Sequence, residues 1–268
     1  MNQILFLSLG MIALLSFIVW IGGKIKPSPY KPIKDESLEI KTFKLPDGLP
    51  QPVENFYRMI YGDDLPHIET FIISGRGQIR FKGITLPAKL RFIHRAGRDY
   101  KHLIQTTFWG IPIMKANEQY VNWESRLVLP FGTVENEPKV NQAANLGLWS
   151  ETLMFPAIYL GTEDVHWKEI DGTTAELIVP FKDEEDRFTV HFNPGTGLID
   201  KMEALRYREP DDQQKTRWQA QALTWGEIDD WTMPTRFAAQ WMDEETPWLV
   251  ANIEHVAWNV DVSSYFAE

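Results

Sequence analysis

Apolar and polar residues alternate along most of the chain from about residue 68 onward. Successive side chains of a β-strand point to opposite faces, so this alternation is typical of strands with one buried face. Glycine, proline, asparagine and aspartate separate the runs, as in the turns of an antiparallel meander. The pattern predicts about ten to eleven strands within the runs 68–74, 77–83, 86–96, 99–109, 111–123, 164–170, 173–181, 186–192, 198–208, 216–228, 233–243 and 247–260.

One long segment, 137–160, lacks this alternation and is rich in helix-forming residues. Pro138 can occupy the first turn of a helix, whereas Pro156 should end or kink it. Residues 146–160 are apolar on nearly every helical face, which is typical of a helix buried against a sheet. A shorter helical spacing over 53–60 stops at Gly62. We predict a mainly β (α+β) fold: a strongly curved antiparallel sheet or open half-barrel with one long apolar helix on its concave face.

The N-terminal residues 4–23 carry no charged side chain. As a helix they would be about 30 Å long, which matches one hydrocarbon core and predicts a single-pass transmembrane helix. Proline-rich residues 24–50 predict an extended linker. The predicted organisation is a transmembrane anchor (1–23), a linker (24–50) and a single β-rich domain (51–268).

Charge is distributed unevenly in the chain. The formal net charge is -10, yet the window 76–101 holds a single acid, Asp99. Eight basic residues fall in the same window: Arg76, Arg80, Lys82, Lys89, Arg91, Arg95, Arg98 and Lys101. This basic surface could contact anionic headgroups, or it could be an ordinary solvated face whose cations pair with acidic loops such as 183–186.

The hairpin over 86–109 has two faces, whose membership depends on the length of its turn. A two- or four-residue turn at 96–99 gives paired residues whose numbers sum to 195. The predicted basic face then carries Lys89, Arg91 and Arg95 beside Tyr100 and His102. His94 lies on the other, mainly apolar face, and a three-residue turn would break this assignment.

His94 and Glu151 are the weak candidates for catalysis. A histidine on an apolar face is usually a hydrogen-bonded core residue, but it can also serve as a base. Glu151 lies in the most apolar helix, where an unpaired charge is costly, so we expect a cationic partner such as Arg206 or Arg95. A general acid with a raised pKa is the alternative role for Glu151.

Several other kinds of chemistry have no sequence support. The chain has no cysteine and no HExxH motif, so no metal site is predicted. No cofactor motif is evident. The acidic net charge and the lack of a nucleic-acid-binding motif argue against a nucleic-acid partner. Protein partners are not indicated.

The ordered segments "RFIHRAGRDY", "NLGLWSE", "VHWKEID" and "MEALRYR" resemble a family of uncharacterised membrane-anchored bacterial proteins of unknown function. The resemblance extends over nearly the whole chain. In element order alone, the fold is also similar to the half-barrels that carry lipoproteins or lipids across bacterial envelopes. This similarity favours an extracytoplasmic body. The positive-inside rule favours the opposite side, because Lys24, Lys26, Lys31 and Lys34 follow the apolar segment.

The sequence therefore predicts a membrane-tethered, non-catalytic domain that binds a lipid or other apolar ligand, as an envelope carrier or sensor. The alternatives are a hydrolase-type enzyme that uses Glu151 and His94, and a structural or partner-binding envelope module. Four residues are predicted to contact the apolar ligand: Trp149, Leu153, Phe155 and Tyr159. Five more are predicted to bind its polar part or a membrane surface: Arg91, Arg95, Arg98, Tyr100 and Arg206.

Overall fold

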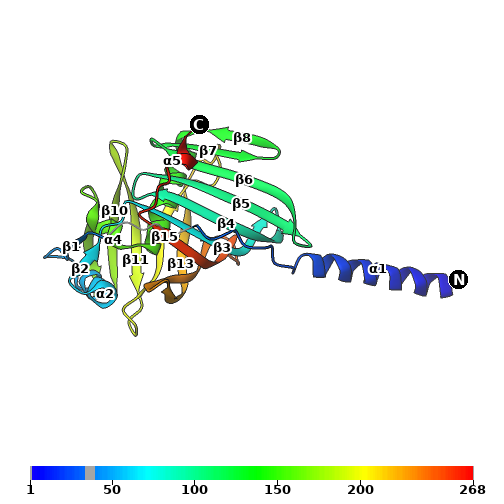
Figure 1. The fold of residues 1–268 in the computed structure, drawn as a ribbon. Helices are drawn as coiled ribbons and strands as arrows, with labels where there is room; N and C mark the ends of the chain where they lie inside the picture. The colour runs from blue at the N-terminus through cyan, green and yellow to red at the C-terminus, as the bar shows by residue number, and fades with distance from the viewer. Residues whose placement is uncertain (1, 34–39, 268) are drawn as a thin grey trace.

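A 13-stranded antiparallel sheet dominates the computed structural model, which describes residues 2–33 and 40–267 (Figure 1). In spatial order the strands are β8 (Gly132–Glu135), β7 (Glu124–Leu129), β6 (Ile111–Val121), β5 (Asp99–Phe108), β4 (Ile84–Arg95), β3 (Thr70–Phe81), β15 (Leu249–Trp258), β14 (Trp231–Trp241), β13 (Thr216–Ile228), β12 (Ile199–Arg206), β11 (Glu184–Phe192), β10 (Thr174–Phe181) and β9 (His166–Asp171).

The sheet consists of two meanders that meet in its middle. The chain enters at β3, runs outward to the edge strand β8, crosses to the opposite edge at β9 and returns to the middle as β15. The pairing of β15 with β3 joins the two meanders. Gly75 and Gly77 of β3 face the backbone of β15 so closely that an added Cβ would lie 1.9 and 2.1 Å from carbonyl oxygens. Only glycine fits at these two positions.

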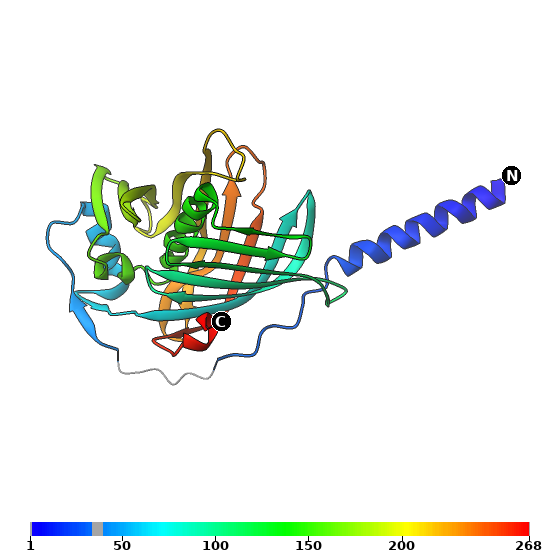
Figure 2. The same ribbon diagram turned by 90° about the horizontal axis from the view of Figure 1, so that it is seen from above.

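The crossover between the two edges is helical and lies over one face of the sheet (Figure 2). It comprises α3 (Pro138–Glu151), the 3-10 turn η1 (Thr152–Met154) and α4 (Ala157–Gly161). Helix α3 contacts β6 and β7 of one meander and β10, β11 and β12 of the other. Strands so far apart in the sheet can reach one helix only if the sheet curves around it, so α3 lies on the concave face. As predicted, the helical segment is broken at Pro156.

A short helix and a two-stranded sheet lie at one end of the body (Figure 1). Helix α2 (Gln51–Tyr61) buries Val53, Phe56 and Tyr57, which confirms the short helix expected there, and it ends at Gly62. Strand β1 (Thr42–Lys44), which lies within the predicted linker, pairs with β2 (Asp64–Pro66).

The apolar N-terminal segment forms helix α1 (Asn2–Gly22), which projects from the body (Figure 1). Its apolar side chains from Phe6 to Trp20 are exposed. None of the helices in residues 2–33 and 40–267 is long and apolar enough to cross a membrane. The prediction that residues 4–23 span one is therefore not supported. Lys34, which entered the prediction of orientation, lies outside the described residues.

The face of the sheet that points away from α3 is covered in part by both ends of the chain. Residues 24–33 run along it, and the C-terminal helix α5 (Ser263–Phe266) lies against it (Figure 2). A small second core forms there, in which Ile72 and Ile93 pack against Val262. We call this side of β3, β4 and β5 the convex face.

The large sheet has 13 strands, one more than the twelve runs marked by the sequence pattern. The predicted runs 68–74 and 77–83 form one strand, β3, because Gly75 lies inside it and marks the close approach of β15 instead of a turn. Strands β7 and β8 were missed, since their short sequences show little alternation.

Candidate functional site

The β4–β5 hairpin turns in three residues, so the predicted register was wrong by one. Arg95 pairs with Asp99, and the turn comprises residues 96–98. Its central residue, Gly97, has a φ of 64°, a left-handed conformation that glycine adopts without strain. A one-residue shift moves every side chain of one strand to the opposite face.

The corrected register gathers three polar aromatic residues on the concave face. His94 pairs with Tyr100, and His102 pairs with Phe92, so Tyr100 and His102 leave the predicted basic face and lie beside His94. All three are almost completely buried. The candidate site follows from this register.

Glu151, the last residue of α3, reaches both histidines. Its Oε2 lies 2.8 Å from His102 Nε2 and 2.9 Å from His94 Nε2. The contact with His102 is a hydrogen bond. The nitrogens of His94 have no hydrogen-bond partner among the described residues, because the oxygen is close but not aligned with the ring N–H. The cationic partner of Glu151 is thus His102, in place of the predicted Arg206 or Arg95.

Glu118 of β6 and Arg206 of β12 complete the polar group. Tyr100 donates a 2.6 Å hydrogen bond to Glu118 Oε1, and Glu118 Oε2 lies 3.5 Å from His102 Nδ1. The Arg206 guanidinium lies 4.7 Å from the centre of the Trp218 ring, in a cation–π contact. We call His94, His102, Glu118 and Glu151 the cavity cluster.

The protonation states of the cavity cluster follow from burial and from its two carboxylates. Burial disfavours charge on His102, but Glu151 and Glu118 outweigh this effect and raise the pKa of His102 to about 9. Burial also opposes ionisation of Glu151, but His102 and His94 lower its pKa to about 2. Burial lowers the pKa of His94. Glu151 is therefore an anion at neutral pH, so its predicted role as a general acid with a raised pKa is wrong.

Aromatic rings fix the orientation of both imidazoles. The His94 ring stacks on Phe71 with ring centres 4.2 Å apart, and the His102 ring stacks on Tyr100 at 4.1 Å. The centre of the His102 ring also lies 4.0 Å from that of Phe92, and the two rings are tilted relative to each other. Side chains locked by packing in this way are preorganised for binding.

A cavity of about 310 Å³ opens beside the cluster, between α3 and the concave face. Its wall is mainly apolar. Its polar lining residues include His102, Glu118, Glu151 and Arg206, together with Arg80, Arg208 and Gln221. Apolar residues from β4, β5, β7, η1, β13 and β14 line the rest, including Phe92, Ile104, Leu127, Leu153, Trp218 and Phe237.

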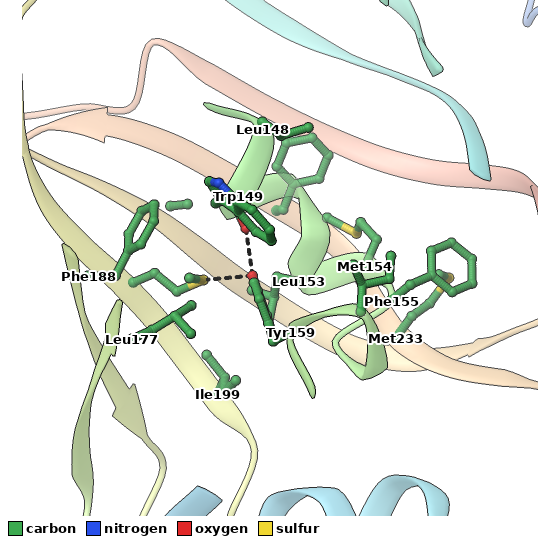
Figure 3. Packing of buried hydrophobic residues seen from close by; sticks show 14 of the residues in the cluster. Leu148, Trp149, Leu153, Met154, Phe155, Tyr159, Leu177, Phe188, Ile199 and Met233 are labelled. Atoms are coloured by element: carbon green, nitrogen blue, oxygen red, sulfur yellow. Dashed lines mark hydrogen bonds between the residues drawn. The ribbon is translucent and has the colours of Figure 1, made fainter. Parts of the chain in front are cut away.

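Of the four residues predicted to contact an apolar ligand, the structure places Leu153 in the cavity wall. Trp149, Phe155 and Tyr159 do not line it and are fully buried in the core (Figure 3). The Tyr159 hydroxyl donates a 2.6 Å hydrogen bond to the Trp149 carbonyl and contacts the Met202 sulfur (Figure 3). Phe155 packs on Phe71. Alternation and apolarity alone could not distinguish lining residues from core residues.

The five residues predicted to make polar contacts lie at three different places. Tyr100 and Arg206 line the cavity. Arg91 lies on the convex face, where it donates hydrogen bonds to Ser74 and to the Lys31 carbonyl. Arg95 and Arg98 both bond to Asp99, and they line a separate surface groove of about 490 Å³.

Sequence reasoning did not select His102 or Glu118 as site residues. The signal that could have found His102 was the turn "AGR", since a central glycine suits a three-residue turn and places His102 beside His94. Glu118 pairs with His102 across β5 and β6. That pairing becomes visible only when the register of the whole meander is known.

Residues 39–253 match the model of a family of unknown function, DUF6544. No curated protein matches the chain. Among solved structures, a LolA superfamily protein from Nitrosomonas europaea is similar, with a TM-score of 0.49 and 10% identity over 81% of this chain and 96% of that chain. A DUF1329 family protein from Desulfovibrio piger has a TM-score of 0.43 and 12% identity over 75% and 90%. Both likenesses are distant, so function has to be inferred from the cavity and its side chains.

Proposed function

The chain belongs to the DUF6544 family, whose function is unknown, and from the site itself we propose that it is a non-catalytic carrier or sensor of a small apolar ligand. The observation that carries this proposal is the cavity of about 310 Å³ between α3 and the concave face. A mainly apolar cavity with a few convergent polar groups is the usual form of a small-molecule site.

The size of the cavity limits the ligand. Its volume lies at the lower end of the range of about 300–1,000 Å³ that is common for ligand pockets. A single acyl chain or a molecule of similar bulk fits this space better than a whole diacyl lipid. Such a ligand removes the apolar wall from water, which contributes about 25 cal/mol per Å² of buried apolar surface.

The polar residues in the cavity wall support a ligand with a polar head. Three arginines line the cavity: Arg80, Arg206 and Arg208. Arg80 pairs with Glu244, and Arg208 pairs with Asp243 and Glu244, so among the described residues Arg206 is the lining arginine left without a carboxylate partner. A carboxylate or phosphate head could accept hydrogen bonds from its guanidinium. The apolar part of the ligand would then lie along Ile104, Leu153 and Phe237.

Mass spectrometry of an organic extract of the purified full-length protein tests the proposal. We expect a co-purifying apolar compound, or failing that, binding of a fluorescent fatty acid that decanoate displaces. If no compound is extracted and no saturable fatty-acid binding is measured, the result counts against the cavity as a ligand site.

A cavity-filling variant sharpens this test. Gly147 of α3 lines the cavity, and a Cβ added to it would meet only the Tyr100 ring and hydroxyl at 3.8–4.0 Å. Gly147→Leu should therefore fold and should weaken fatty-acid binding by about tenfold or more, since each 1.4 kcal/mol lost is tenfold in affinity. Gly172→Leu is the matched control, because an added Cβ there meets open space. Equal binding by the two variants would place the ligand elsewhere.

The hydrolase alternative retains one supporting contact, the 2.9 Å approach of His94 Nε2 to Glu151 Oε2. His94 does not line the cavity, however, and a base must reach its substrate. An esterase activity that Glu151→Gln abolishes, without loss of folding, would favour this alternative. The envelope location and the partner-binding role stay predictions.

A further inference from the structure

We propose that His94, His102 and Glu151 form a binding site for a divalent transition-metal ion, of which Zn²⁺ is the best match. Their potential ligand atoms lie within 4.8 Å of one another. Two histidines and one carboxylate are the donor set of several zinc sites, and borderline metal ions favour imidazole nitrogen.

The geometry is close to that of a metal site. Glu151 Oε2 lies 2.8 Å from His102 Nε2 and 2.9 Å from His94 Nε2. Ligand atoms 2.0–2.1 Å from a tetrahedral zinc ion are about 3.3 Å apart. The two distances from Glu151 Oε2 to the histidine nitrogens therefore need to lengthen by only about half an ångström to match such an ion.

The burial of His94 supports the metal site independently of these distances. Its side chain is completely buried, and neither ring nitrogen has a hydrogen-bond partner among the described residues. A buried polar atom without a hydrogen bond costs about 1–3 kcal/mol, and the contact of Nε2 with the Glu151 carboxylate offsets part of that cost. Its Nε2 is nevertheless held next to Glu151, and stacking on Phe71 fixes the ring. A metal ion would satisfy this nitrogen without moving the ring far.

Glu118 acts on His102 from the other side of the ring. Its Oε2 lies 3.5 Å from His102 Nδ1, whereas His102 Nε2 points to Glu151. A carboxylate behind a metal-binding histidine fixes the tautomer and makes the facing nitrogen a stronger ligand. Binding a metal requires the ligand nitrogens of both histidines to be unprotonated.

The proposed site faces the cavity. His102 and Glu151 both line it, so a coordination position not filled by the protein would be open to small molecules there. Three protein ligands leave at least one such position on zinc. With Glu118, Glu151 and Arg206, a dication leaves one net positive charge, which an anion in the open position would neutralise.

Co²⁺ titration of the full-length protein, after treatment with EDTA, tests the site. We expect one equivalent to bind, with visible absorption bands that added Zn²⁺ removes and that azide shifts. His94→Gln, His102→Gln and Glu151→Gln should each weaken binding by more than a hundredfold. The matched control is His191→Gln, because His191 lies near one carboxylate, Glu203, at 3.8 Å, and Glu203 is not in the cluster. It should bind as the wild type does.

Glu118→Gln keeps all three ligands, so it provides the binding test if a ligand variant fails to fold. We expect it to weaken Co²⁺ binding about 10- to 100-fold, as is usual for a residue that orients a ligand. Zn²⁺ should also raise the melting temperature of the wild type but not that of folded ligand variants. No stoichiometric Co²⁺ uptake by the wild type would overturn the proposal. Unchanged affinity in both Glu118→Gln and the folded ligand variants would do so too.

Discussion

The two faces of the β4–β5 hairpin share one backbone but place their polar side chains in opposite environments. On the concave face, His94, Tyr100 and His102 are almost fully buried and meet carboxylates from two other elements. On the convex face, Lys89 and Arg91 lie against the ring of Tyr30, at 4.6 and 4.8 Å. The side chains of the two faces differ only in their alternation along the strands. A register shift of one residue therefore changes which side chains form the site.

The convex face also accounts for several of the basic residues that are concentrated in this part of an acidic chain. Its cations hold the two ends of the chain: Arg76 donates to the Pro27 carbonyl, and Lys101 donates to the Tyr265 carbonyl. Arg95 lies 4.2 Å from the centre of the Phe266 ring. These contacts involve partly solvated groups, for which each interaction contributes little. The two faces should therefore differ strongly in their response to mutation.

The two faces should differ most in how much stability is lost when a carboxylate on each face is neutralised. Glu151→Gln leaves the buried imidazolium of His102 without its main partner, which should lower the free energy of unfolding by about 3 kcal/mol in metal-free protein. Glu254→Gln is the control, because its partner Arg76 is partly exposed on the convex face. It should lower this free energy by less than about 1 kcal/mol. Urea denaturation measures both, and equal losses would remove the distinction between the faces.

Two tyrosine hydroxyls provide a smaller contrast. Tyr100→Phe removes the hydrogen bond to Glu118, so we expect the free energy of unfolding to fall by about 1.5 kcal/mol. Tyr30→Phe keeps the ring that meets Lys89 and Arg91 and should change this free energy by less than about 0.5 kcal/mol. An unchanged free energy of unfolding in Tyr100→Phe would show that water already satisfies the hydrogen-bonding groups at this position.

A third test asks how firmly the convex face holds the N-terminal segment. Tyr30→Ala removes both cation–π contacts and should lower the free energy of unfolding by about 0.5–1 kcal/mol. Hydrogen exchange should become faster in residues 24–33 while α3 stays protected. Faster exchange throughout α3 would mean that this segment supports the core instead of only covering it.

The smallest expected effect is that of salt. Arg91→Ala loses its bond to the Lys31 carbonyl, and we expect a difference from wild type below about 1 kcal/mol. That difference should shrink as ionic strength rises, because salt screens the interactions of a solvent-exposed charge. The difference caused by Glu151→Gln should persist. A salt-independent Arg91→Ala effect would indicate a contact that is mainly one of packing.

Much of the fold could be predicted from local patterns. Alternation identified the longer strands, and Pro138 and Pro156 marked the limits and the break of the helical crossover. Gly75 misled the prediction because a glycine within a strand and a glycine at a turn look alike in sequence. What distinguishes Gly75 from a turn glycine is its pairing with β15, which lies about 175 residues further along the chain.

The site was less predictable because it depends on register and on distant partners. His94 and Glu151 could be selected from their apolar surroundings, but His102 was placed on the wrong face by the assumed turn length. The partnership of Glu118 with His102 requires the pairing of β5 with β6. Similarly, no local pattern showed that Trp149 fills the core while Leu153 lines the cavity.

The seam between β3 and β15 has a consequence for how the chain folds. The Thr70 hydroxyl donates to the Val260 carbonyl across 190 residues, and the whole seam joins the first long strand to the last one. During synthesis the N-terminal meander must wait, with one edge unpaired, until the C-terminal strand has left the ribosome. Pairing between such distant segments makes folding slow and exposes that edge to association with other chains. Truncation just before β15 should therefore yield aggregates instead of a smaller soluble body.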